Sequence, residues 1–187
     1  MSSRIVVLSL MAAFAGGCAA FAQDAPPVDG PPPLQAPHFS KAVIAAPYDN
    51  ASQTLSPDAK TLTILFTGLR AETKVDGLQA ATAGVALMLP LTTVAGEPPP
   101  VVKLDFRGDA SPGGSRSFCW LGISTPASSH GSFFSADAEV REELTVQVPA
   151  RSPGLVVTVL LQCLATGAEP GASALLEIDS IDVTLAN

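Results

Sequence analysis

The chain has 187 residues, with 10 basic and 17 acidic side chains, a net charge of −7, and no cluster of Lys or Arg. Because a phosphate backbone is bound through clustered cations, nucleic acid is not an expected partner. An acidic protein also gains nothing from an anionic lipid surface. The length is enough for one domain with a substantial core.

The N-terminus has the pattern of a secretory signal peptide. Arg4 precedes an apolar run over residues 5–15, and small residues then lead to an A-x-A sequence ending at Ala22. The run is too short to cross about 30 Å of hydrocarbon. We therefore predict a signal peptide over residues 1–22, cleavage between Ala22 and Gln23, and a secreted or periplasmic location.

Cys18 offers an alternative, because cleavage before it would leave a lipoprotein anchored to the cell envelope. The position three residues before this cysteine holds Ala15, where a lipidation signal calls for Leu or a similar aliphatic residue. The A-x-A site is better formed, so we favour the free protein. No later segment is apolar enough for a transmembrane helix, because charged residues interrupt each run.

Residues 23–38 are rich in proline, which favours extended backbone and removes hydrogen-bond donors, and we expect a disordered spacer there. From residue 39 onward, short apolar runs alternate with clusters of Pro, Gly, Asn and Asp. The runs that predict strands are residues 41–45, 60–66, 84–91, 100–106, 117–123, 142–148, 155–164, 173–178 and 182–185.

Eight or nine short strands without intervening helices predict a single all-β domain over residues 39–187, an antiparallel β-sandwich or a barrel-like variant of it. Residues 155–164 are almost continuously apolar, which is typical of a central strand covered on both faces. Residues 142–148 alternate more strictly and predict one wet face. We interpret residues 68–84 as a loop or an edge strand with room for one helical turn.

Two segments are interpreted as loops that present a recognition surface, residues 107–115 (RGDASPGGS) and residues 125–134 (TPASSHGSFF). The first contains an Arg-Gly-Asp tripeptide, but Gly and Asp also suit a turn between strands, so adhesion through it is not favoured. Asn50 begins a glycosylation sequon, which matters only in a eukaryotic host.

Cys119 and Cys163 are the two cysteines left after export, and we predict a disulfide between them. Closing such a loop would stabilise the domain by roughly 3–4 kcal/mol. Because Trp120 adjoins Cys119, the bridge could pack against this Trp in the core. A zinc site or a redox pair lacks support, since no Cys/His spacing matches one and neither cysteine lies in a C-x-x-C motif.

Acidic residues of two segments form a candidate polar-ligand or calcium site, made of Asp105, Asp109, Glu177, Asp179 and Asp182. On a strand, Glu177 and Asp179 would share a face, where repulsion could raise one pKa. The favoured interpretation is a solvated strand face with Arg107 paired to a carboxylate. The alternatives are calcium binding and a carboxylate pair for glycoside hydrolysis.

No catalytic constellation stands out from the sequence. His130 has Ser128, Ser129 and Ser132 nearby but lies in an expected loop, and no G-x-S-x-G motif is present. His38 lies in the spacer. We therefore expect no metal, cofactor or enzymatic activity, and interpret the chain as an exported binding or structural module for a glycan or an envelope protein. The alternatives are a glycan-directed carboxylate enzyme, a calcium-stabilised adhesin-like domain and the lipoprotein.

Three segments in order resemble the secreted family known as domain of unknown function 4360. Residues 55–72 (LSPDAKTLTILFTGLRAE) are similar to its Ser-Pro-Asp turn and following strand, residues 102–111 (VKLDFRGDAS) to its D-[YF]-R-G-x-A-S segment, and residues 171–182 to its late strand. The family's Phe-Asp-x-Phe is replaced by Phe66-Thr67-Gly68-Leu69, and its usual Cys by Gly84. The resemblance implies an exported β-rich domain and no activity.

Intact mass under non-reducing conditions tests the leader and the bridge together. We expect a mature chain that begins at Gln23 and is two hydrogens lighter than its reduced form. A lipid-modified mass beginning at Cys18 would show the lipoprotein alternative to be right. Free thiols at positions 119 and 163 would contradict the disulfide.

Overall fold

The computed structural model describes residues 36–45, 48, 50–74, 79–94, 96–114, 116–165 and 173–186. The chain divides into two units, Met1–Pro32 and Pro33–Asn187. The first unit lies outside the described residues, and with it the predicted signal peptide, its cleavage site, Cys18 and most of the predicted spacer.

The described residues of the second unit form eleven strands, against the eight or nine that the sequence predicts. Their bounds are β1 His38–Phe39, β2 Val43–Ile44, β3 Ala51–Leu55, β4 Thr61–Lys74, β5 Gln79–Thr92, β6 Val101–Pro112, β7 Ser117–Ser124, β8 Ser129–Phe134, β9 Ala138–Gln147, β10 Gly154–Ala165 and β11 Ser173–Ala186. The described residues contain no helix, so none of them forms a helix that could cross a membrane.

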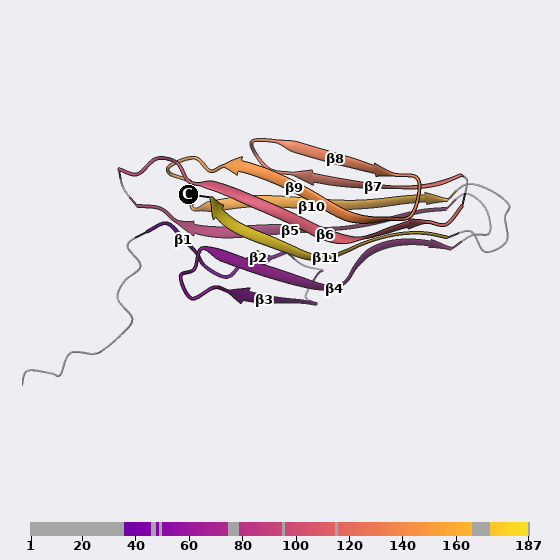
Figure 1. Ribbon diagram of the computed structural model, residues 1–187, viewed down its shortest axis with the longest axis horizontal. Helices are drawn as coiled ribbons and strands as arrows, with labels where there is room; N and C mark the ends of the chain where they lie inside the picture. Colours follow the sequence, from indigo (N-terminus) through magenta and orange to yellow (C-terminus); the bar gives the residue numbers. More distant parts are fainter. Residues whose placement is uncertain are drawn as a thin grey trace, which may run out of the picture. The chain divides into compact units, whose positions relative to one another are not determined.

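The strands form two antiparallel sheets packed face to face, which confirms the predicted β-sandwich (Figure 1). One sheet has the order β1-β5-β10-β7-β8, with β2 also paired to β5. The other has the order β3-β4-β11-β6-β9. From β4 to β11 most successive strands lie in opposite sheets, so the chain crosses repeatedly between the layers and ties them together.

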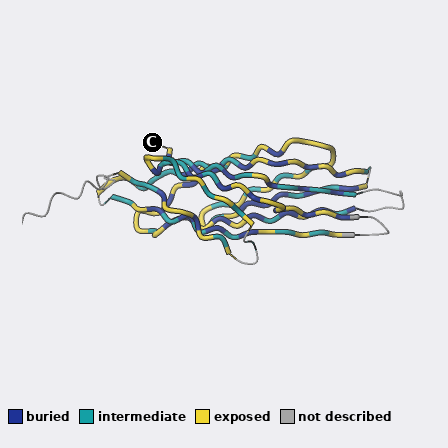
Figure 2. The backbone as a smooth tube through the Cα atoms, turned by 90° about the horizontal axis from the view of Figure 1, so that it is seen from below, coloured by how far each residue is buried: buried dark blue, intermediate teal, exposed yellow. Residues whose placement is uncertain are grey.

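The core lies between the sheets and takes about every second residue of the long strands β4, β5, β6, β10 and β11. Leu62, Ile64, Phe106 and Leu161 are among the side chains that are fully buried there. Figure 2 shows buried positions alternating with less buried ones along the strands. This alternation follows from the period of two in a strand, which directs neighbouring side chains to opposite faces of its sheet.

The predicted turn of residues 56–60 is present between β3 and β4. The Ser56 hydroxyl donates to Asp58 Oδ1 at 2.6 Å, and the Lys60 amide donates to the same oxygen at 3.1 Å. These bonds lower the pKa of Asp58, and the bond from the Ser56 hydroxyl contributes most. Ala59 takes a positive φ of 54°, as tight turns of this kind require.

The two separately predicted strands at residues 173–178 and 182–185 are one strand, β11, joined through an irregularity. Its register shifts between Ile178 and Ser180 against both neighbouring strands, and Ile178 and Ile181 are both buried although three residues apart. Gly68 of β4 takes a φ of 81° at this level, and Gly108 of β6 lies so close to the Glu177 carbonyl that a Cβ would collide with it.

The interpretation of β10 as a strand covered on both faces is wrong. Its residues alternate between buried and more exposed, and Val156 keeps 40% of its surface exposed. The strand is central within its sheet, between β5 and β7, but only its inner face meets the other sheet. Its outward apolar residues are therefore not explained by the core. By contrast, β9 has the mixed exposure expected of a strand with one wet face.

Two further expectations change, and one is kept. Of the segment predicted as a recognition loop at residues 125–134, most is strand β8, and β6 continues through the Arg-Gly-Asp tripeptide to Pro112. Residues 68–74 and 79–84 belong to β4 and β5, each paired there with one neighbour only, so the edge-strand alternative holds and the described residues contain no helical turn.

Cys119 and Cys163 form the predicted disulfide, with an S–S distance of 2.05 Å. The bridge joins β7 to β10 within one sheet, because the two cysteines are direct cross-strand partners with Cα atoms 4.1 Å apart. Both are buried. Trp120 is not beside the bridge in the core, because the next residue of a strand points to the opposite face.

Removal of the bridge should lower the free energy of unfolding. We expect the double variant Cys119→Ala, Cys163→Ala to lose about 3–4 kcal/mol in urea denaturation, since a loop with a sequence separation of 44 is no longer closed in the unfolded chain. Wild-type protein with the disulfide reduced should lose a similar free energy of unfolding. A loss below about 1 kcal/mol in both would contradict a structural role.

Candidate functional site

The predicted acidic site is an ion-pair network on the outer face of the second sheet. Arg107 Nη2 donates to Asp105 Oδ2 at 3.0 Å and lies 3.6 Å from Asp182 Oδ2, while the Thr63 hydroxyl donates to Asp182 Oδ1 at 2.6 Å. The hydrogen bond to Asp105, together with the charges of Asp105 and Asp182, raises the pKa of Arg107. The predicted pairing of Arg107 with a carboxylate is therefore present.

The other acidic residues extend this charged face instead of forming a pocket. Glu177 of β11 is paired in register with Asp109 of β6 on one side and with Arg70 of β4 on the other, and Asp179 occupies the irregularity of β11. None of the five predicted acidic residues lines a described hollow, and the described residues include no group of three or more metal-ligating side chains. The five acidic residues therefore lie on an open strand face and not in one of the described hollows.

His130 lies at the edge where β8 and β9 face each other across the sandwich. Its Nε2 is 2.8 Å from Glu142 Oε2 and 3.4 Å from the Ser132 hydroxyl. In a nucleophilic triad the serine and the carboxylate contact different ring nitrogens. Here both contact the same nitrogen, so the arrangement joins the two sheets and does not have the geometry of a proton relay.

The two outer faces of the sandwich differ sharply in charge. The strands of the first sheet contain no Asp, Glu, Lys or Arg. The strands β4, β6, β9 and β11 of the second sheet carry many of both signs. Among the described large hydrophobic side chains that are exposed, Val43, Phe133 and Val156 belong to the first sheet and Leu65 to the second. We call the outer face of β5, β10, β7 and β8 the neutral face.

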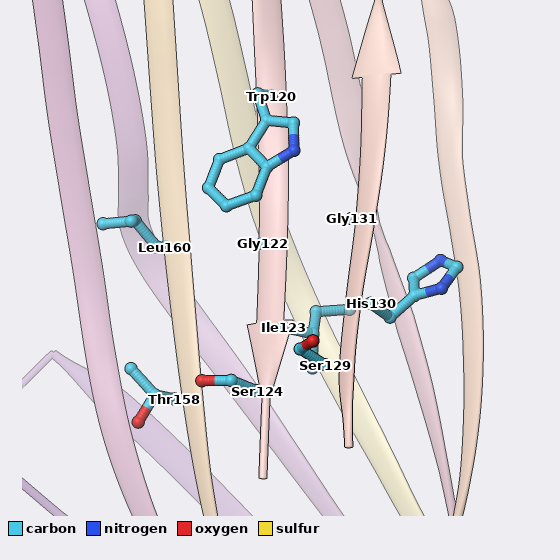
Figure 3. Close-up of a pocket in the computed structure, with 9 residues that line it drawn as sticks. All are labelled: Trp120, Gly122, Ile123, Ser124, Ser129, His130, Gly131, Thr158 and Leu160. Carbon is cyan, nitrogen blue, oxygen red and sulfur yellow. The ribbon is translucent and has the colours of Figure 1, made fainter.

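Trp120 lies flat on the neutral face. The residues beside its ring are Gly122 of its own strand and Gly131 of β8, which are direct cross-strand partners. A Cβ on Gly122 would collide with the six-membered part of the indole, and one on Gly131 would come within 2.9 Å of Nε1. Two glycines on neighbouring strands therefore leave the space in which the ring rests against the sheet, and Figure 3 shows the ring face-on above β7.

A hollow of about 290 Å³ adjoins the indole, and we call it the Trp120 hollow. Beyond the two glycines, the lining side chains that reach the neutral face are Trp120, Ser124, Ser129, Thr158 and Leu160. Figure 3 shows the hydroxyls of this set gathered beyond the ring, and the His130 ring directed away from it. The side chains that reach the neutral face combine one aromatic surface with three exposed hydroxyls and no charge, which suits binding of a neutral ligand.

Sequence reasoning assigned recognition to loops and missed this strand face. The sequence did hold one indication of this face. Because neighbouring residues of a strand point to opposite faces, a buried Cys119 places Trp120 on the outer face. The glycines at positions 122 and 131 could not be matched to the ring, since the pairing of β7 with β8 was unknown.

No family model matches the chain, and no curated protein does. The resemblance to domain of unknown function 4360 therefore stays a prediction. Among solved structures, TmCBM61 in complex with β-1,4-galactotriose overlaps 80% of this chain and 91% of its own, with 8% identity and a TM-score of 0.34. The enzymatically active domain of bacteriophage CBA120 tailspike protein 4 overlaps 81% and 19%, with 11% identity and a TM-score of 0.29. Overlaps this loose carry no statement about function.

Substitution of the glycine beneath the indole should lift the ring from the sheet. The chain has a single Trp, so its fluorescence reports on this site alone. We expect Gly122→Val to shift Trp120 emission to longer wavelength and to increase its quenching by acrylamide. Ser124→Val, on the same strand and face but beyond the ring, is the matched control and should leave both unchanged. Equal spectra for the two variants would show that Gly122 does not seat the ring.

Proposed function

We propose that the protein is an exported, non-catalytic binding module that holds a neutral glycan on the neutral face, with Trp120 as the stacking platform. The observation that carries this proposal is the indole lying flat over Gly122 and Gly131 beside uncharged hydroxyl groups. The disulfide between Cys119 and Cys163 is compatible with an oxidising compartment outside the cytoplasm.

The chemistry of the face matches that of a sugar ring. A pyranose has an apolar face of C–H groups, which packs against an aromatic ring, and a rim of hydroxyls that both donate and accept hydrogen bonds. Trp120 supplies the aromatic surface, with a large contact area and few rotatable bonds. The hydroxyls of Ser124, Ser129 and Thr158 match the rim, because each can donate and accept as the sugar requires.

The absence of charge narrows the ligand class. A sulfated or uronic-acid polymer would be matched by Lys or Arg, and the strands of this sheet hold neither. A neutral polymer has no charged groups that must give up their hydration on reaching the face, so it suits this face better than a charged polymer.

A second copy of the chain is the competing occupant, because exposed apolar residues on a flat sheet face also suit face-to-face packing. The Trp120 ring, which lies flat on the sheet, and the hydroxyls beside it favour a glycan over a second copy as the occupant. Close packing of two sheets would be served by aliphatic side chains, and the hydroxyls beside Trp120 would then be buried without assigned partners.

Retention in native gels that contain a neutral polysaccharide tests the proposal. With a panel of β-glucan, xylan, mannan and galactan, we expect at least one to slow the wild-type protein. Trp120→Ala should lose this retention because stacking supplies most of the contact. Leu65→Ala, which truncates an exposed apolar residue on the other sheet, is the matched control and should be retained like wild type. Retention should not depend on salt, since no charge pairs form.

Two outcomes would contradict the proposal. One is that no neutral polysaccharide in the panel slows the protein. The other is a dimer in light scattering that Trp120→Ala dissociates and Leu65→Ala does not, because the neutral face would then be occupied by a second copy.

A further inference from the structure

A second hollow of about 250 Å³ opens on the same neutral face, and we call it the Phe118 hollow. The outward side chains that line it are Ala80 and Thr82 of β5, Phe118 of β7, and Gln162 and Leu164 of β10. Like the Trp120 hollow, it contains no charged side chain. Its aromatic surface is the ring of Phe118, which contacts the Phe133 ring of β8 with centroids 5.0 Å apart.

The strand register places the two hollows in line along β10. Thr158 and Leu160 border the Trp120 hollow, and Gln162 and Leu164 border the Phe118 hollow. The four residues alternate along the same outward face, so the centres of the two hollows lie four residues apart. At about 3.3 Å per residue, this separation is roughly 13 Å, which is longer than one sugar ring.

Gln162 lines the Phe118 hollow and is the next outward residue of β10 after Leu160, which lines the Trp120 hollow. It is the cross-strand partner of Trp120 on β7 and of Thr82 on β5, and its side chain is exposed. Its amide offers two donors and an acceptor. An occupant that lies along β10 and extends from the Trp120 hollow into the Phe118 hollow must pass this amide, so Gln162 can bond to its hydroxyls.

We propose that the ligand of the neutral face is an extended oligosaccharide chain that lies along β10 and fills both hollows. Trp120 holds one part of the chain, the Phe118–Phe133 pair holds another, and Gln162 bonds to the stretch between them. This inference rests on the proposed glycan binding and adds to it the length and direction of the ligand. A single sugar or a disaccharide fills one hollow only, and gains little from the second.

A chain-length series tests the inference. The probes are the cello-, xylo-, manno- and galacto-oligosaccharides from mono- to hexasaccharide, and calorimetry with Trp120 emission as a second readout measures their affinity. We expect affinity to rise by at least about tenfold between the disaccharide and the longest members of the series whose polymer is retained, as the chain reaches the second hollow.

Substitutions separate the two hollows. Phe118→Ala should remove most of the gain of the long oligosaccharides and leave the disaccharide unchanged, whereas Trp120→Ala should weaken both. Gln162→Leu should also lower the affinity for long members only, and because it keeps a similar volume on an exposed position it guards against a folding defect in Phe118→Ala. Leu65→Ala remains the matched control, and thermal unfolding of each variant checks its fold.

The inference and the proposed function fail separately. If a polysaccharide is retained but the disaccharide binds as tightly as the hexasaccharide, or if Phe118→Ala and Gln162→Leu leave the length dependence intact, the two-hollow site is wrong and glycan binding stands. If neither polymer nor oligosaccharide binds to the wild-type protein, the proposed function itself is wrong.

Discussion

Each strand of this protein has two faces, and the packing of two sheets against each other uses only one of them. The inner faces meet in a core of aliphatic and Phe side chains, and this core includes the disulfide that joins β7 to β10 within the first sheet. Because the period of a strand is two, burying one set of side chains leaves the other set facing outward. The strands of this chain therefore differ mainly in the composition of their outward side chains. These side chains can serve a function without disturbing the fold.

The two outward sets have opposite character. On the second sheet, charged residues of both signs cover the outer face, and ion pairs form within a strand or diagonally between strands, as Arg107 does with Asp105 and Asp182. Exposed pairs of this kind add little stability but keep a flat face solvated and discourage other chains from packing on it. On the first sheet that protection is missing, and aromatic and hydroxyl side chains take its place. An uncharged face with exposed apolar side chains lowers solubility, and the glycan that we propose would cover part of it.

The sequence predicted the layer architecture well because alternating apolar runs separated by Pro and Gly clusters leave few alternatives. The disulfide was also predictable, since two cysteines remained and an oxidising compartment favours pairing. The single strand β11 was predicted as two, because Asp179 and Ser180 look like a turn until their pairing with β4 and β6 carries the strand through an irregularity. The apolar continuity of residues 155–164 was interpreted as burial of both faces, because local sequence does not distinguish a covered face from an exposed one.

What the sequence alone determined is the all-β class, the bridge between Cys119 and Cys163, and the lack of clustered cations, all of which follow from composition and local period. Tertiary structure decided the site. Trp120, Gly122, Gly131 and Gln162 come from three strands, and only the hydrogen-bonded register of β7 with β8 and β10 brings them to one surface. Register is set by non-local pairing and by which faces are buried together, and a single strand carries no record of its neighbours.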